Sequence, residues 1–172
     1  MMKKELTRRS FLKLAGVGAL AVAMSGSLTG CDVIENLKDM DSVSAAIGDV
    51  KFMLSASAWV NNGSNGMSYQ PTCEIRNNSK KAVTYGGSGS NCEVIITGVL
   101  TDKNGKEYPM TYAGEKGSAP AGEKYEVKDF KLVAVGKKLY MEGSKVVITF
   151  TYNGRKAVFT EYNDGNITSK VE

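Results

Sequence analysis

Apolar residues recur at every second position through most of the chain after about residue 45, and this pattern predicts β-strands. Turn-forming residues separate the apolar runs at short intervals, as hairpin connections require. No stretch of this part of the sequence has the three-to-four residue spacing of an amphipathic helix. The expected strands cover residues 50–60, 69–75, 82–85, 92–100, 108–112, 125–135, 145–152 and 156–162.

The order of these segments favours an antiparallel architecture, because parallel pairing would require long crossover connections that the sequence lacks. A two-sheet sandwich buries one face of each strand, so we expect an all-β sandwich of about seven or eight strands. The rhythm of residues 46–162 is similar to that of the immunoglobulin-like domains of bacterial surface lipoproteins. Trp59 does not lie between Cys73 and Cys92, so the antibody-type order of cysteine, tryptophan and cysteine is missing.

The N-terminal segment carries an export motif. Residues 7–13 read TRRSFLK and resemble the twin-arginine signal, with its arginine pair at Arg8 and Arg9 followed by Phe11 and Leu12. An apolar stretch follows over residues 14–24, and it is shorter than the roughly 20 residues that a membrane-spanning helix needs. The resemblance implies a signal peptide that directs the folded protein to the twin-arginine translocase.

The signal peptide ends in a second motif. Residues 28–31 read LTGC and resemble the bacterial lipobox, which implies a diacylglyceryl thioether on Cys31 and cleavage before it by the lipoprotein signal peptidase. We therefore expect a signal peptide at 1–30, a lipidated tether at 31–44 and a β-sandwich domain at 45–172. The expected location is the extracytoplasmic face of the cell membrane, with the lipid as anchor.

The net charge of +4 comes entirely from the predicted signal peptide at residues 1–30. Residues 1–30 hold five basic residues and one acidic residue, which leaves 17 of each kind in the rest of the chain. A neutral domain without clustered lysines and arginines lacks the basic surface that binds the phosphate backbone of a nucleic acid. Nucleic acid is therefore not an expected partner.

The absence of histidine narrows the chemistry further. It excludes histidine-based acid–base catalysis, Ser-His-Asp and Cys-His nucleophilic systems, and histidine metal sites. Two cysteines besides Cys31 are too few for an all-cysteine metal or iron–sulfur site. We therefore expect no metal, no cofactor and no catalytic residue.

Cys73 and Cys92 lie on β segments on either side of a glycine-rich loop. An oxidising extracytoplasmic compartment favours a disulfide between them. The alternative is a pair of buried free thiols, because a chain exported in the folded state folds first in the reducing cytoplasm.

Aromatic residues are the candidate binding groups. Trp59 closes a strand just before a glycine-rich loop, and Tyr112 belongs to a set of tyrosines on or near strands that would suit a recognition surface. We expect a non-enzymatic module that binds an envelope protein or glycan. Two alternatives are a structural subunit of a membrane complex and a glycan hydrolase whose acidic pair would come from Glu115, Glu123, Glu126 and Asp129.

Overall fold

A computed structural model describes residues 42–61, 66–135 and 142–172, all within the compact unit Leu37–Glu172. The predicted signal peptide, Arg8, Arg9, Phe11, Leu12 and Cys31 lie outside the described residues. The first strand begins at Val43, two residues before the expected start of the domain.

The described part of the chain contains twelve strands in one hydrogen-bonded sheet. The strands are β1 (Val43–Ile47), β2 (Val50–Asn61), β3 (Met67–Asn77), β4 (Val83–Gly87), β5 (Val94–Thr101), β6 (Glu107–Tyr112), β7 (Gly117–Ala119), β8 (Glu123–Val127), β9 (Leu132–Ala134), β10 (Lys145–Tyr152), β11 (Arg155–Tyr162) and β12 (Ile167–Val171).

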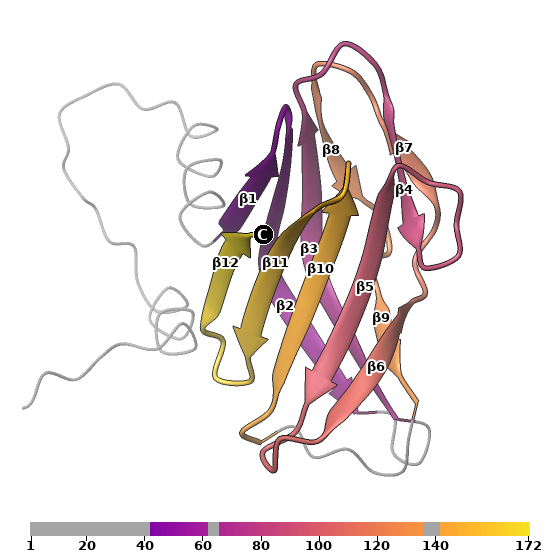
Figure 1. Cartoon of the computed structure of the whole chain (residues 1–172). Coiled ribbons are helices and arrows are strands. Elements are labelled where there is room, and N and C mark those ends of the chain that lie inside the picture. Colours follow the sequence, from indigo (N-terminus) through magenta and orange to yellow (C-terminus); the bar gives the residue numbers. More distant parts are fainter. Residues whose placement is uncertain (1–41, 62–65, 136–141) are drawn as a thin grey trace, which may run out of the picture. The chain divides into compact units, whose positions relative to one another are not determined.

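The sheet is antiparallel except for the pairing of β4 with β5. Its main order is β1-β2-β3-β9-β6-β5-β10-β11-β12. Both β8 and β9 pair with β3, each along a different half, while β4 and β6 share β5 in the same way. In Figure 1, β10, β11 and β5 cross in front of β2 and β3, so the sheet curls into two opposed layers.

The curled sheet is a nearly closed barrel whose seam lies between β1 and β12. These strands stand at opposite ends of the strand order but side by side in space (Figure 1). No backbone ladder joins them among the described residues. The Ser169 hydroxyl instead donates a hydrogen bond of 2.9 Å across the seam to the Ser44 carbonyl.

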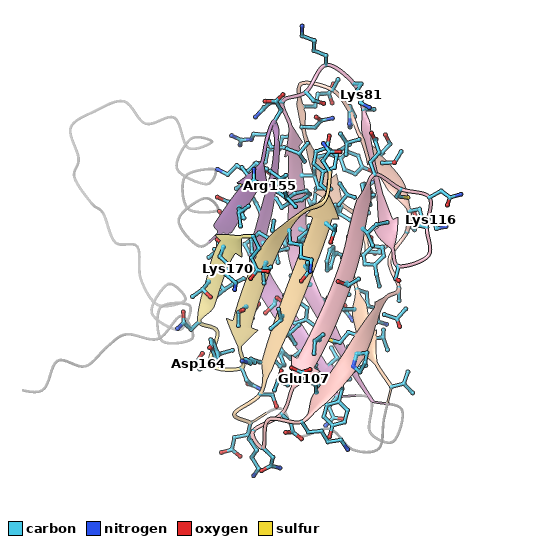
Figure 2. The ribbon with its side chains drawn as sticks, in the orientation of Figure 1. Lys81, Glu107, Lys116, Arg155, Asp164 and Lys170 are labelled. Carbon is cyan, nitrogen blue, oxygen red and sulfur yellow. The ribbon has the colours of Figure 1, made fainter. Side chains whose placement is uncertain are left out.

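The core fills the space between the two layers. Phe52 of β2 stacks on Phe150 of β10 with ring centroids 4.7 Å apart, and Phe159 of β11 meets Phe150 edge-on. Gly98 of β5 also allows close packing, because a Cβ there would lie 2.8 Å from the Leu132 side chain and force it to shift. Most charged side chains lie outside the barrel, and Figure 2 shows four exposed examples: Lys81, Lys116, Asp164 and Lys170. Glu161 of β11 is the buried exception among the described residues.

The all-β, antiparallel prediction is confirmed, but the predicted number of seven or eight strands is too low. The expected strand at 125–135 is two strands, separated by a turn in which Asp129 has a φ of 52°. The short β7 and the C-terminal β12 were not expected, and Gly86 and Gly87 belong to β4 rather than to a loop. The opposed layers of a sandwich are present as parts of one continuous sheet.

Candidate functional site

A β-bulge in β2 places two polar side chains on the inner face of the barrel. The register of β2 against β3 shifts between Ser55 and Ser57, where one extra residue enters β2. Side chains alternate between the two faces, so the extra residue reverses which positions point inward. Phe52 is buried before the bulge, whereas Trp59 packs against the core after it and Ala58 is exposed.

The two side chains aimed inward by the bulge meet a carboxylate from the opposite side of the seam. Glu161 of β11 is only 6% exposed. Its carboxylate accepts hydrogen bonds from the Ser57 hydroxyl and the Tyr69 hydroxyl, and a longer one of 3.3 Å from Trp59 Nε1. The Trp59 and Tyr69 rings meet edge-on with centroids 5.6 Å apart. We call Ser57, Trp59, Tyr69 and Glu161 the seam cluster.

The electrostatics of the seam cluster keep Tyr69 protonated. Burial raises the pKa of the Tyr69 hydroxyl far above its usual value, and the negative charge of Glu161 raises it further. A hydroxyl that keeps its proton remains a hydrogen-bond donor to the carboxylate. Glu161 is therefore a fixed acceptor that links β2, β3 and β11.

The chemistry available to the seam cluster is narrow. Its three donors are all engaged with one carboxylate, and glycoside hydrolysis requires two carboxyl groups that flank the bond. Within residues 42–61, 66–135 and 142–172, no three Asp, Glu, Cys or His side chains gather as a metal site would require. The arrangement suits a structural bridge better than a reaction centre.

A pocket of about 280 Å³ opens at the end of the barrel where three hairpin or strand-connecting turns meet. Its lining residues are Ile47, Gly48 and Asp49 from the β1–β2 turn, Ser79 from the β3–β4 connection, and Tyr152, Asn153 and Arg155 from the β10–β11 hairpin. We call this the turn pocket.

Local backbone chemistry holds the turns around the turn pocket in place. Asn153 and Gly154 both have positive φ, at 49° and 75°, as a two-residue type I′ hairpin turn requires. The Asn78 amide donates a hydrogen bond of 2.8 Å to the Asp49 carbonyl, which ties the β3–β4 connection to the β1–β2 turn. Asn77 accepts hydrogen bonds from both the amide and the hydroxyl of Ser79.

The lining of the turn pocket combines apolar residues with two opposite charges. Ile47 and Tyr152 are 3% and 8% exposed, so their side chains belong to the core beneath the opening. Asp49 and Arg155 are exposed, and Figure 2 labels Arg155 near the upper end of β11. In the described part of the chain, neither of these two residues forms an ion pair within 4.0 Å. Both charges therefore face solvent at the pocket.

The structure separates the two predicted binding aromatics. Trp59 is partly buried in the seam cluster. Tyr112 is 8% exposed, packs edge-on against Phe130 with centroids 5.3 Å apart, and donates a hydrogen bond of 3.0 Å to the Glu115 carbonyl. Burial raises the pKa of the Tyr112 hydroxyl. Tyr112 is thus enclosed in the core instead of lying on an open recognition surface.

The disulfide predicted between Cys73 and Cys92 is absent from the structure, where both are free thiols. Cys73 is fully buried on the inner face of β3, opposite Leu54 and Val127 in the neighbouring strands. Cys92 is only half-buried and lies just before β5, where its sulfur would be 3.1 Å from a Cβ placed on Gly86. Cys73 therefore belongs to a central strand and Cys92 to the connection between β4 and β5. Burial raises the pKa of the Cys73 thiol.

The acidic residues considered for hydrolysis are all exposed: Glu115, Glu123, Glu126 and Asp129. None of them lines the turn pocket. Sequence reasoning missed Glu161, although it shares the inward parity of Ala157 and Phe159 and is thus an acid on an apolar face. It also missed the turn pocket, whose residues come together only through the topology.

Comparisons with known proteins found no matching family model, no matching curated protein and no matching solved structure. Among the described residues, none forms a helix long and apolar enough to cross a membrane.

Proposed function

We propose that this protein is a lipid-anchored, non-enzymatic binding module that holds a small ligand or an exposed group of an envelope component in the turn pocket. The anchor follows from the sequence: TRRSFLK precedes a short apolar segment and then LTGC, in the order that an exported lipoprotein requires. The lipid on Cys31 keeps the β domain at the extracytoplasmic face of the cell membrane. Its partners during export are the twin-arginine translocase and the lipoprotein signal peptidase.

The observation that carries the binding role is the turn pocket itself. Binding sites are concave, partly apolar and equipped with a few convergent polar groups. The lining of this pocket includes the nearly buried Ile47 and Tyr152 and the exposed, charged Asp49 and Arg155. The turns stand on paired strands, so the pocket is positioned by a rigid scaffold. Loops held in this way are common carriers of binding residues.

A thermal unfolding experiment tests this proposal. The full-length protein is heated with and without a deproteinated, low-molecular-weight extract of the cell envelope, because a ligand that binds only the folded state raises the midpoint temperature. We expect the extract to stabilise the native protein and the control Lys156→Gln, but not Arg155→Gln. Lys156 neighbours Arg155 in β11, is also exposed and does not line the pocket. Equal stabilisation of all three proteins, or of none, would contradict a binding role for the pocket.

A further inference from the structure

The charges of the turn pocket indicate which chemical class it binds. Arg155 offers a planar fork of donors that suits a carboxylate, and Asp49 offers an acceptor that suits an ammonium group. Because neither side chain has an ion-pair partner among the described residues, a ligand would not have to displace one. An anionic ligand would be attracted by Arg155 and repelled by Asp49, and a cationic ligand would meet the reverse.

The remaining groups in the pocket set the size and polarity of the ligand. A pocket of about 280 Å³ lies just below the usual range of ligand pockets, about 300–1,000 Å³, so it suits a molecule of one or two amino-acid residues. Ser79 and Asn153 add polar groups to the lining, while Ile47 and Tyr152 add apolar surface that could contact a short side chain. The whole set matches a small zwitterion with an apolar body.

We infer that the turn pocket binds a free amino acid or short peptide through both its carboxylate and its ammonium group, with Arg155 and Asp49 as the respective partners. This inference rests on the proposed binding function and specifies its ligand. Recognition by two opposite charges also explains why Asp49 and Arg155 approach one pocket from separate turns. A zwitterion neutralises both charges at once, so its binding leaves no unpaired charge in the pocket.

The test uses alanyl-alanine as the zwitterionic probe and the full-length protein labelled with nitrogen-15. Backbone amide resonances of Gly48, Ser79 and Asn153 report binding at the pocket, and a ligand of this size should bind with a dissociation constant of about 1 mM. Two matched probes lack one charge each: N-acetyl-alanyl-alanine lacks the ammonium group and alanyl-alanine amide lacks the carboxylate. Each should bind roughly tenfold more weakly or worse, because a hydrogen bond to a charged group is lost.

The variants assign the two charges to residues. Arg155→Gln should reduce alanyl-alanine affinity roughly tenfold or more, and so should Asp49→Asn. The controls Lys156→Gln and Asp164→Asn change the same charges at exposed positions outside the pocket and should leave the affinity unchanged. Arg155→Gln should also abolish the preference for alanyl-alanine over its amide.

The outcomes separate this inference from the proposed function. If alanyl-alanine moves none of the pocket resonances, or binds no better than the two half-charged probes, the zwitterion inference is wrong. The binding function would then still stand if the envelope extract stabilises the native protein and not Arg155→Gln. If neither the dipeptide nor the extract distinguishes Arg155→Gln from Lys156→Gln, both the inference and the proposed function fail.

Discussion

Removing the Tyr69 hydroxyl tests whether the seam cluster stabilises the fold. Tyr69→Phe keeps the ring, which is fully buried, and deletes only the oxygen that donates to Glu161. Glu161 is 6% exposed, so water has little access to replace the lost donor. A hydrogen bond to a charged group contributes about 1.5–3 kcal/mol, and we expect the free energy of unfolding to fall by that amount.

Urea denaturation of the full-length protein measures this loss. With a slope of about 2 kcal/mol per molar urea, a loss of about 2 kcal/mol lowers the midpoint by about 1 M. The matched control is Tyr162→Phe, because Tyr162 is 42% exposed and neighbours Glu161 in β11. An exposed substitution of this kind should change stability by about 0.5 kcal/mol or less.

A double-mutant cycle identifies the charge of Glu161 as the cause. In a Glu161→Gln background, Tyr69→Phe should cost only about 0.5–1.5 kcal/mol, because the hydrogen bond it removes is then between neutral groups. If Tyr69→Phe is as stable as Tyr162→Phe, the seam cluster does not stabilise the fold as we argue. Equal costs of Tyr69→Phe in both backgrounds would show that the carboxylate charge has no part in it.

Three further predictions concern pH, thiols and export. Burial raises the folded-state pKa of Tyr69, so the contribution of this group to stability is fully present below the unfolded pKa of about 10. Above that pH the contribution is lost at up to about 1.4 kcal/mol per pH unit. Urea midpoints should therefore fall less steeply with pH between about pH 10 and 12 for Tyr69→Phe than for the native protein, and an equal fall would contradict this. In native full-length protein a maleimide reagent should label the half-buried Cys92 quickly and the buried Cys73 only after unfolding, as read by peptide mass spectrometry. Equal labelling rates of the two thiols would show that Cys73 is not enclosed. Replacing Arg8 and Arg9 by lysine should leave precursor in the cytoplasm, and Cys31→Ser should release the protein from membranes; an unmodified residue at the mature terminus of the membrane-bound native protein would contradict the lipid anchor.

The regular strands could be predicted from the sequence because their alternation reports burial directly. In β5 and β10 every second residue is buried without exception, as the apolar pattern of these segments predicts. The bulge in β2 gives no such signal, since Ser55, Ala56, Ser57 and Ala58 are all small. The break between β8 and β9 depends on the left-handed backbone of Asp129, which tertiary pairing with two halves of β3 imposes.

The two candidate sites differ in how much of them the sequence contains. Trp59 could be singled out as a strand-end aromatic, and Glu161 has the parity of a buried face, but their contact spans 102 positions in the chain. The turn pocket joins three turns from distant parts of the sequence, and nothing in any one turn indicates the other two. The cysteine pairing was inferred from compartment and count, neither of which specifies the side-chain directions that a disulfide requires.

The seam links the irregular parts of the fold to one another. β1 pairs with only the first half of β2, up to Leu54, so β1 does not extend along the second half of β2. The bulge occurs just after this point and turns Ser57 and Trp59 toward Glu161 of β11. Side chains bridge the seam, where no backbone ladder joins the described strands β1 and β12. The Ser169 hydroxyl donates to the Ser44 carbonyl, and the Ser57 and Tyr69 hydroxyls donate to Glu161. A backbone ladder can form with almost any sequence, whereas a side-chain bridge requires particular residues. Glu161 supplies such a bridge from the otherwise apolar inner face of β11.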